Sequence, residues 1–483
     1  MPRLCDRTLA QVRTGVERPT YDRGAVEIGV VHFGPGAFHR AHQAPAFDAL
    51  LARGDRRWGV CGVSLHSAAV RDALAPQDWL YTLVELDAEI RARVIGAMKA
   101  VLAAPQSPAA VLQRLADPRT RMVTLTVTEK GYCLTPAGDL NLAHADVAFD
   151  AGRPSAPRSA AGWLVEGLRR RRATAAGPLS VVSCDNLTDN GRKLARAVVA
   201  LARAQGDGDL ASWIEAEARF PNTMVDSITP ATDDALRETA RRLTGLDDAW
   251  PIQRERFTQW VIEDRLAPGA PDLASVGAQI AADVRPFEQA KLRLLNGAHS
   301  TLAYVGLLAG LTTVAEAMCD APLAAFVERL MREDIAPTLR ATRGLDLASY
   351  IDGILDRFRN PAIRHQLAQI AWDGSQKLPV RLLGTVADTL AAGRPIGRLA
   401  VPVGAWMLFA ARRAAAGGEA LVDPLAPAIR TLAMAPLAAQ PAGFLALETV
   451  FPRALAADPR FSDAVTEAYR ALASDRLAAA LAA

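Results

Sequence analysis

Short runs of apolar, β-branched residues alternate with amphipathic segments along the first 285 residues of the chain. Four such runs predict buried strands, because each is short and rich in valine, isoleucine or threonine. They span residues 25–34, 58–65, 121–132 and 178–186. Helical patterns lie between the runs, as at residues 159–173. This alternation predicts an α/β domain with a mostly parallel sheet.

The pattern changes near residue 286 to an alanine- and leucine-rich helical periodicity without a convincing strand. We therefore expect two domains. The first is an α/β domain over residues 1–285, and the second is a mainly α-helical C-terminal domain over residues 286–483.

Two stretches of the α/β half carry local signals. Residues 220–230 (FPNTMVDSITP) are interpreted as a loop that carries Asn222 and Asp226. A helix is expected to begin at Asp185 or Asn186, because either side chain can cap a helix N-terminus. Asn186 is also a candidate for a ligand site, since ligands of open α/β sheets bind outside the carboxyl ends of the strands.

A glycine turn follows the first predicted strand. Gly34 and Gly36 flank a proline, and a helix is expected to begin directly after them. A strand, a glycine turn and a helix N-terminus together can bring backbone amides against a pyrophosphate, as in a Rossmann-like domain. His39 stands where the third glycine of the usual motif would be, so the glycines alone are a weak signal.

The end of the second predicted strand bears on the choice of cofactor. An NAD-selective domain usually places an acid there to bind the ribose hydroxyls. This chain has His66 and Ser67 instead, with Arg71 a turn later. The cofactor is therefore predicted to be NAD or NADP. Thr128 and Glu129, at the end of the third predicted strand, are expected at the same edge of the sheet.

A polar cluster occurs at residues 287–300 (FEQAKLRLLNGAHS). On an α-helix at about 100° per residue, Glu288 lies about 60°, His299 about 80° and Asn296 about 140° from Lys291. All four side chains then share one broad face. Lys291 and His299 would be about 12 Å apart along the helix axis, which suits an elongated substrate.

Composition makes Lys291 conspicuous. The chain has five lysines among fifty-five basic residues, so arginine serves nearly everywhere that a positive charge is needed. A lysine is needed where the group must lose its proton, because burial can tune an amine toward neutral pH but not a guanidinium. A surface lysine on an amphipathic helix is the alternative.

The overall composition narrows the classes of function. A net charge of +3, with arginines interleaved with acids, indicates no nucleic-acid stripe. The five cysteines are scattered without a C-x-x-C pair, which favours a reducing compartment over disulfides or a zinc cluster. The N-terminus has no apolar signal segment, and the weakly polar run at residues 301–318 favours a buried helix over a membrane span. We therefore expect a cytoplasmic protein that binds neither nucleic acid nor membrane.

The helical half contains one polar-rich passage, at residues 357–385. It carries Arg364, Lys377 and Arg381, and Lys377 is another of the rare lysines. The passage is either a substrate site or an ordinary solvated loop.

With these residues in view, the chain resembles the mannitol dehydrogenase family of long-chain polyol dehydrogenases over nearly its whole length. Six motifs match the family in the same order: GPGAFHRAHQ at 34–43, TVTEKGYC at 126–133, SCDNLTDNG at 183–191, FPNTMVDSITP at 220–230, KLRLLNGAH at 291–299 and DGSQKLP at 373–379. The ordered set is more specific than any single motif. The resemblance implies a nicotinamide-dependent oxidoreductase that interconverts a secondary alcohol of a polyol with a ketose.

The resemblance also implies roles for individual residues. Lys291 would be the general base that takes the hydroxyl proton, and Glu288 would relay protons to solvent. Asn186 and Asn296 would hydrogen-bond the developing oxyanion, while His299 would orient the substrate. The substrate site would include Asp226, Lys377, and Arg364 or Arg381. The expected cofactor site comprises Gly34, Gly36, Ala37, Phe38, His39, Arg40, His66, Ser67, Thr128 and Glu129.

The sequence leaves two kinds of sugar substrate open, a neutral one and an acidic one. D-mannitol and D-fructose are the first expectation, and D-fructuronate with D-mannonate is the alternative, because Arg364 or Arg381 could bind a carboxylate bidentately. Ser227 stands where an arginine commonly follows the family's aspartate. A monomer is suggested by the resemblance. No metal is expected, although a metal-dependent sugar isomerase using His39 and His42, and a non-catalytic dinucleotide-binding protein, are remote alternatives.

Overall fold

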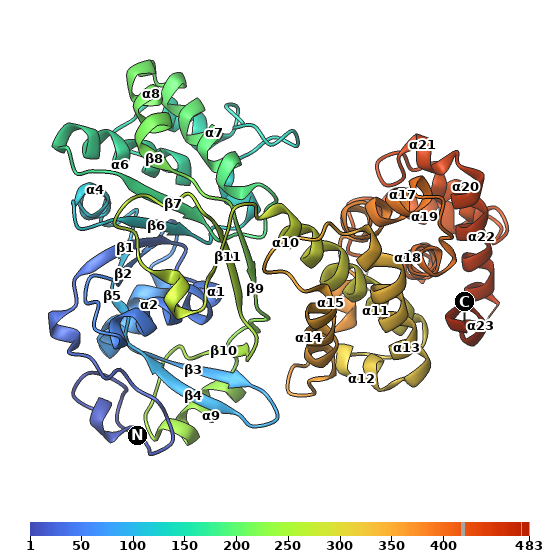
Figure 1. Cartoon of the computed structure of the whole chain (residues 1–483), viewed down its shortest axis with the longest axis horizontal. Helices are drawn as coiled ribbons and strands as arrows, with labels where there is room; N and C mark the ends of the chain where they lie inside the picture. The colour runs from blue at the N-terminus through green and yellow to red at the C-terminus, as the bar shows by residue number, and fades with distance from the viewer. Residues whose placement is uncertain (417–420, 475, 483) are drawn as a thin grey trace. The chain divides into compact units, whose positions relative to one another are not determined.

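A computed structural model describes residues 1–416, 421–474 and 476–482 (Figure 1). The chain divides into two compact units, Met1–Arg285 and Pro286–Ala483. Within the described residues, all strands belong to the first unit and the second unit is built from helices. The structure confirms the predicted fold class, a Rossmann-like, mostly parallel sheet followed by a mainly helical region.

A six-stranded parallel sheet forms the centre of the first unit. The strand order is β5-β2-β1-β6-β7-β8, so the direction in which strands are added reverses between β1 and β6. Ligands of open α/β sheets bind at such a reversal, outside the carboxyl ends of the strands. The strands span Ile28–Phe33 (β1), Gly59–Ser64 (β2), Met98–Ala103 (β5), Met122–Leu125 (β6), Leu179–Ser183 (β7) and Ala218–Arg219 (β8).

Both faces of this sheet are covered, which explains the nearly continuous apolar runs of its strands. Val31 and Phe33 of β1 face a core shared with helices α4, α6, α7 and α8. Val30 points to the opposite face, into a core that includes Phe47 of α2, as the alternation of a strand requires. The helices span Gln43–Ala52 (α2), Pro108–Ala116 (α4), Ala160–Thr174 (α6), Asn190–Ala204 (α7) and Gly208–Glu217 (α8).

Two three-stranded sheets, ordered β10-β3-β4 and β12-β11-β9, contribute to the core on the α2 face. Their strands span Tyr81–Leu86 (β3), Arg91–Ile95 (β4), Thr223–Asp226 (β9), Ile252–Glu255 (β10), Gln259–Glu263 (β11) and Gln279–Ala281 (β12). The remaining helices of the unit are Ala37–Ala41 (α1), Ala69–Leu74 (α3), Ala145–Gly152 (α5) and Asp234–Thr244 (α9).

The predicted loop at residues 220–230 is wrong, because its centre forms strand β9. This strand pairs antiparallel with β11, which places Asp226 opposite Gln259. The partner strand lies well beyond the loop in sequence, so no local pattern marks the pairing. The third predicted strand is also too long, since β6 ends at Leu125 and Thr128 adopts a positive φ of 65° that an extended strand excludes.

The expected helix start at Asp185 or Asn186 is wrong as well. Helix α7 begins at Asn190, directly after Asp189, whose φ of 53° is left-handed. Asp185 does not cap the helix, because its carboxylate accepts hydrogen bonds from two backbone amides after β6 instead.

The long helix α18 (Gly397–Ala415) is the centre of the second unit. Helices α11 (Gly297–Leu308) and α22 (Pro459–Ala473) pack against it, and Trp406 of α18 contacts the ring of Phe444. None of the described helices combines the length and the hydropathy that crossing a membrane requires. The other helices are Arg285–Ala290 (α10), Val314–Cys319 (α12), Ala321–Arg329 (α13), Leu347–Arg359 (α14), Leu367–Ile370 (α15), Gly374–Leu378 (α16), Gly384–Ala391 (α17), Ala426–Ala433 (α19), Gln440–Leu445 (α20), Arg453–Ala456 (α21) and Leu477–Ala482 (α23).

Three π-helical segments interrupt the helices of the second unit, at Lys291–Asn296, Leu330–Ile335 and Pro379–Leu383. The first lies between α10 and α11 and packs against the other two. A π-turn closes hydrogen bonds from residue i to i+5, is rare, and occurs frequently at functional sites.

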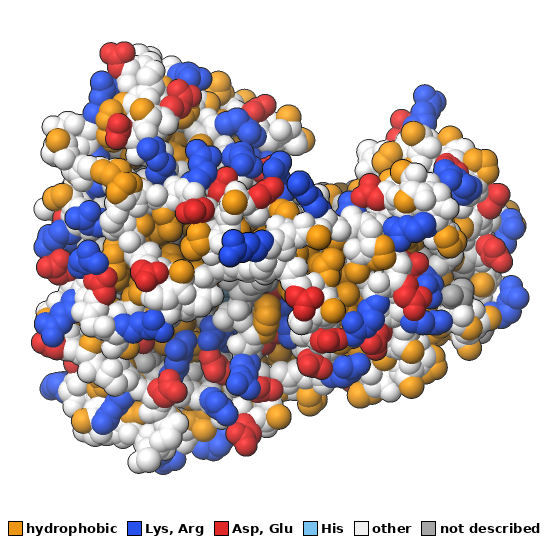
Figure 2. Space-filling view, in the orientation of Figure 1, with side chains coloured by type: hydrophobic (Ala, Val, Ile, Leu, Met, Phe, Trp, Pro, Cys, Tyr) orange, Lys and Arg blue, Asp and Glu red, His pale blue; other side chains and the backbone are white. Residues whose placement is uncertain are grey.

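Charges are mixed on the face of the molecule that Figure 2 draws. On the face drawn in Figure 2, Lys and Arg side chains are interleaved with Asp and Glu side chains, and the described residues there form no continuous basic stripe. Exposed ion pairs such as Arg332 with Glu328 at 2.9 Å are common along the described chain. Each such pair contributes little to stability, so we draw no stability argument from their number.

The two glycines after β1 have different reasons to be glycine. Gly34 has a φ of 84°, and a Cβ there would lie 2.1 Å from the backbone oxygen of Thr126. Gly36 has a negative φ, and its nearest contact would be the oxygen of Gly34 at 3.8 Å. Gly34 is therefore required by the fold itself, whereas Gly36 leaves open space beside its backbone.

We predict that Gly34→Ala lowers the free energy of unfolding by roughly 2–4 kcal/mol, through backbone strain and overpacking against β6. Gly36→Ala is the matched control and should change it by only about 0.5 kcal/mol. Urea unfolding followed by tryptophan fluorescence measures both. Equal stability of the two variants would contradict the close approach of Gly34 to Thr126.

Candidate active site

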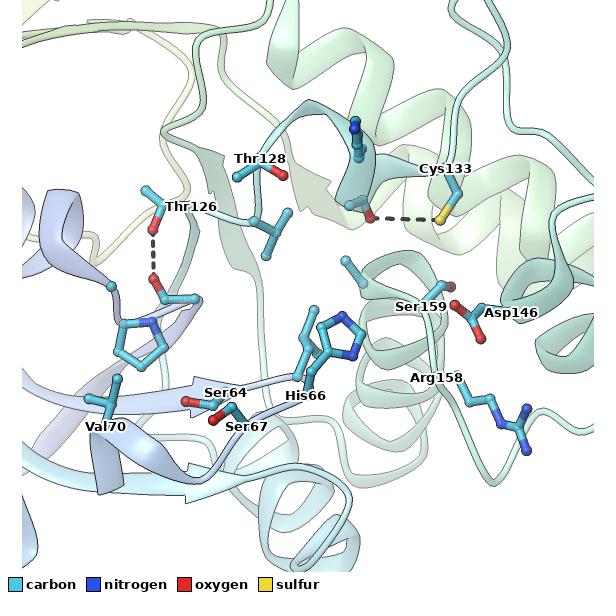
Figure 3. A pocket seen from close by; sticks show the side chains of 18 of the residues that line it. Ser64, His66, Ser67, Val70, Thr126, Thr128, Cys133, Asp146, Arg158 and Ser159 are labelled. Carbon is cyan, nitrogen blue, oxygen red and sulfur yellow. Dashed lines mark hydrogen bonds between the residues drawn. The ribbon is translucent and has the colours of Figure 1, made fainter. Parts of the chain in front are cut away.

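A cavity of about 520 Å³ lies in the first unit at the carboxyl ends of β1, β2 and β6 (Figure 3). This is the edge at which the strand order reverses, where a ligand of an open α/β sheet is expected. Five of the predicted cofactor residues line it: Gly34, Gly36, His66, Ser67 and Thr128.

The other predicted cofactor residues do not line this cavity: Ala37, Phe38, His39, Arg40 and Glu129. Arg40 is fully buried, donates to the backbone oxygen of Trp250 at 2.9 Å and stacks over the Trp250 ring. Burial lowers the pKa of Arg40 to about 10. His39 is also fully buried and stacks on His32 with the ring centroids 3.4 Å apart. Both side chains therefore build the core beneath the glycine turn.

His32 holds the ends of β1 and β6 together. Its Nδ1 lies 2.7 Å from the hydroxyl of Thr124, and its Nε2 lies 2.9 Å from the hydroxyl of Thr126. The Thr126 hydroxyl also donates to the backbone oxygen of Gly34 at 2.8 Å, as drawn in Figure 3. Burial lowers the pKa of His32 to about 3, so this ring is neutral. A histidine inside a strand pattern gave no signal of this role in the sequence.

Asp185 fixes the loop that forms one wall of the cavity. Its carboxylate accepts hydrogen bonds from the backbone amides of Val127 at 3.0 Å and Thr128 at 2.8 Å, and from the Tyr132 hydroxyl at 2.7 Å. Two sequence motifs, TVTEKGYC and SCDNLTDNG, are thus joined through one buried side chain. Asn186, the predicted catalytic amide of this unit, follows Asp185 directly.

Asn190 attaches the same segment to strand β9. Its Nδ2 donates to the backbone oxygen of Thr223 at 3.0 Å, and its Oδ1 accepts from the Thr223 amide at 2.9 Å. Asp226, the predicted substrate residue, is the last residue of β9 and is buried. Asn190 was not singled out from the sequence, although it lies within a matched motif.

The charges around the cavity bear on the cofactor. The end of β2 contributes His66 and Ser67 but no carboxylate. Arg71 is already engaged, because its guanidinium bonds the carboxylate of Asp72 and the side chain of Gln106. Figure 3 shows Asp146 and Arg158 on the α5 and α6 side of the cavity, across from Ser67.

The predicted helix of the second unit is not α-helical throughout. Glu288 belongs to α10, the π-turn runs from Lys291 to Asn296, and His299 lies in the first turn of α11. The rotation of about 100° per residue therefore does not hold across the turn. Because a π-turn takes an extra residue, Asn296 is turned back toward the face of Lys291, five residues earlier. The interruption brings these two side chains closer in angle than an α-helix would.

His299 is buried against two rings. The ring of Phe358 lies 4.5 Å away between centroids, and that of His365 lies 5.1 Å away. Burial, together with the nearby positive groups, lowers the pKa of His299 well below its usual value, so the ring is neutral. Its Nε2 is buried without a hydrogen-bond partner among the described residues, so this atom can serve a ligand.

The passage at residues 357–385 forms helices and tight turns rather than a solvated loop. Asp373 has a φ of 53°, and Gly374 packs so closely that a Cβ would lie 2.2 Å from the indole nitrogen of Trp406. The Ser375 hydroxyl donates to Asp423 at 2.6 Å. These contacts fix the start of α16, which carries Lys377.

The three basic residues of this passage differ in their surroundings. Lys377 is half-buried and donates to the backbone oxygen of Ile370 at 3.2 Å. Arg381 is half-buried and donates to the Ser300 hydroxyl at 3.2 Å. Arg364 is exposed and lines a hollow beside Thr313.

The alternative metal site, at His39 and His42, has no third ligand among the described residues. His42 Nε2 lies 2.9 Å from the backbone oxygen of Gln259, and His39 stacks on His32. Among the described residues, no three His, Cys, Asp or Glu side chains gather as metal ligands would.

Comparison with known proteins gives matches along the whole chain. Residues 28–275 match the mannitol dehydrogenase Rossmann domain, and residues 283–473 match the mannitol dehydrogenase C-terminal domain. D-mannonate oxidoreductase of Escherichia coli (strain K12) is 42% identical over 475 residues, which cover 96% of this chain and 97% of that protein. Mannitol 2-dehydrogenase of Aspergillus fumigatus is 38% identical over 489 residues, covering 98% and 97%.

A solved structure extends the similarity to three dimensions. The Pseudomonas fluorescens mannitol 2-dehydrogenase, in ternary complex with NAD and D-mannitol, superposes with a TM-score of 0.85 at 37% identity and covers 99% of both chains. Since both family domains match and relatives well above 30% identity span nearly the full length, this chain belongs to the mannitol dehydrogenase family.

Proposed function

We propose that this chain is an NAD(P)-dependent oxidoreductase that transfers a hydride between the cofactor and a secondary alcohol carbon of a polyol. The observation that carries the proposal is the position of Lys291. This rare lysine opens a π-turn that ends at Asn296, and the buried, neutral His299 follows within one further turn. A base, an amide and a hydrogen-bonding ring are thereby presented along one helix.

The cavity of the first unit supports the cofactor. It lies where the strand order reverses, and Gly36 has open space in place of a side chain, so the backbone can approach a pyrophosphate closely. When bound, the nicotinamide ring accepts or supplies the hydride. His66, Ser67 and Thr128 line the same cavity and can contact the rest of the cofactor. Residues 1–285 are thus proposed as the dinucleotide-binding domain.

The second unit is proposed as the catalytic and substrate domain. Lys291 takes the hydroxyl proton as the carbinol is oxidised and returns it in the reverse direction. The side-chain amide of Asn296 donates a hydrogen bond to the oxygen as negative charge develops, in the manner of an oxyanion hole, and the family resemblance implies the same role for Asn186 of the first unit. Glu288 lies almost one helical turn before Lys291, at a distance suited to proton relay.

We propose that further side chains, which are buried or half-buried, bind the hydroxyl groups of the substrate. His299 has a buried nitrogen without a partner among the described residues, which suits a hydrogen bond to a substrate hydroxyl. Asp226 and Lys377 can bind further hydroxyls. Two substrate pairs fit this chemistry: the neutral pair D-mannitol and D-fructose, and the acidic pair D-mannonate and D-fructuronate. The name of the E. coli relative refers to the acidic sugar.

We further propose that the chain acts as a monomer in the cytoplasm. All five cysteines are free, which suits a reducing compartment. Light scattering after gel filtration should give a mass near the 51.4 kDa of one chain, and a mass of about twice that value would contradict the monomer.

We predict that Lys291→Met lowers kcat by roughly 10²- to 10⁴-fold, because methionine has similar volume but cannot carry a proton. Binding of NADH, followed by quenching of tryptophan fluorescence, should stay within about twofold, since Lys291 does not belong to the unit that holds the cofactor cavity. Stopped-flow absorbance at 340 nm measures the chemical step directly.

Lys193→Met is the control for this experiment, because Lys193 lies on α7, outside the cofactor cavity and the Lys291 helix. It should keep full activity. If Lys291→Met also keeps full activity, the general-base role is wrong and a non-catalytic dinucleotide-binding protein becomes the better interpretation.

The residues at the end of β2 predict which nicotinamide cofactor the protein accepts. Without a carboxylate there, NADPH should be accepted, and Ser67→Asp should lower kcat/KM for NADPH by roughly 10- to 100-fold through repulsion of the 2′-phosphate. Aspartate keeps an acceptor for the Ala69 amide that Ser67 now caps at 3.1 Å. Activity with NADH should be unchanged or higher. The control is Ser212→Asp on the exposed surface of α8, and an unchanged preference in Ser67→Asp would contradict the prediction.

A further inference from the structure

Arg381 is a half-buried cation without a counter-charge among the described residues. It extends from the third π-turn, and its hydrogen bond to the Ser300 hydroxyl is neutral. Within the described chain, no carboxylate lies within salt-bridge distance of Arg381. Arg398 is the ordinary case, because its guanidinium bonds the carboxylates of Asp334 at 2.6 Å and Glu333 at 2.5 Å.

Arg171, which is buried, is satisfied by backbone oxygens instead. The guanidinium of Arg171 donates to four backbone oxygens, those of Leu115, Asp117, Ala176 and Gly177, between 2.9 and 3.2 Å. A guanidinium carries five N–H donors, and Arg381 uses one of them in a hydrogen bond within the described protein. The other donors are available to a ligand or to water.

A second cation lies beside Arg381. Lys377 precedes it by four residues, and both burial and the charge of Arg381 lower the pKa of Lys377. Asp373 and Asp423 act on Lys377 in the opposite sense, but Asp423 already accepts hydrogen bonds from the amide and hydroxyl of Ser375. Two like charges in a half-buried setting are unfavourable without an anion.

The pair lies next to the predicted substrate-orienting histidine. Ser300, which Arg381 contacts, is the residue after His299, and the charge of Arg381 contributes to the lowered pKa of His299. A backbone contact fixes this arrangement, since a Cβ on Gly297 would lie 3.1 Å from the Arg381 carbonyl oxygen. The hydroxyl of Tyr304 and Nε2 of His299 are also buried without partners among the described residues.

We propose that Arg381, with Lys377 beside it, binds a carboxylate of the substrate, so that the preferred substrate is an acidic keto sugar rather than a neutral ketose. This inference rests on the proposed function and adds the chemical class of its substrate. A carboxylate can accept two parallel hydrogen bonds from a guanidinium and supplies the missing counter-charge. A neutral sugar offers only hydroxyl groups at the same place and leaves Arg381 without a carboxylate partner.

The first experiment measures reduction of D-fructuronate and D-fructose by the full-length protein, with NADH and NADPH in turn. We expect kcat/KM for D-fructuronate to exceed that for D-fructose by about 10²-fold or more. Arg381→Met should lower kcat/KM for D-fructuronate by roughly 10²-fold, mainly through KM, because binding rather than chemistry is lost. The value for D-fructose should change less than about threefold.

Two further variants serve as controls for Arg381→Met. Arg359→Met removes an exposed arginine of the same passage, one that pairs with Asp356, and should leave both sugars unaffected. Arg381→Lys keeps the charge but not the planar pair of donors, and should restore part of the D-fructuronate activity. Equal losses for both sugars in Arg381→Met, or a wild-type preference for D-fructose, would overturn the inference.

A measurement on the unmodified protein guards against misfolding of the variant. D-gluconate and D-sorbitol differ in having a carboxylate or a neutral hydroxyl at one end, and D-gluconate should inhibit D-fructuronate reduction with at least a tenfold lower Ki. Equal Ki values would overturn the inference while leaving the oxidoreductase intact. Failure of the proposed function looks different, because then neither sugar would oxidise NADH or NADPH.

Discussion

The cavity at the carboxyl ends of β1, β2 and β6 depends on one buried carboxylate, that of Asp185. It ties the backbone amides of Val127 and Thr128, and the hydroxyl of Tyr132, to the end of β7. Thr128 has a φ of 65°, a conformation that costs free energy and persists only where the surroundings hold it. Burial raises the pKa of Asp185, and the three donors oppose that rise by stabilising the charged form. The wall of the cavity therefore exists because a residue that follows β7 holds the loop that follows β6.

A comparable constraint operates in the second unit. The π-turn at Lys291 replaces regular i to i+4 hydrogen bonds, which costs stability unless the packing around it compensates. Its neighbours are two further π-turns, and the small Gly297 lets the backbone of Arg381 approach closely. The chemistry-bearing side chains are thus placed by irregular backbone, whereas α18 and the helices around it supply the apolar core.

The fold was predictable because its signals are local. A sheet covered on both faces needs continuous apolar strands, and such runs are visible in the sequence. Strand β9 was missed because its pairing depends on β11, far along the chain. The glycines after β1 were found at the cavity, but Arg40 of the same motif points into the core. A match of residues in a sequence motif does not show which way each side chain points. The π-turn at Lys291 was invisible for a related reason, since its residues are ordinary helix formers.

The distribution of charge shows what an arginine-rich sequence conceals. Fifty arginines make positive charge uninformative by itself, and several of those described have ordinary structural roles. Arg40 and Arg171 are buried but bond backbone oxygens, while Arg398 bonds carboxylates. Arg40 and Arg381 each make one hydrogen bond from the guanidinium and have no carboxylate partner among the described residues, but Arg40 lies in the core, whereas Arg381 is half-buried and contacts Ser300, the residue after His299. Such a difference arises from tertiary contacts alone. The burial and the partners of each arginine are therefore needed to tell these cases apart, and no sequence pattern expresses them.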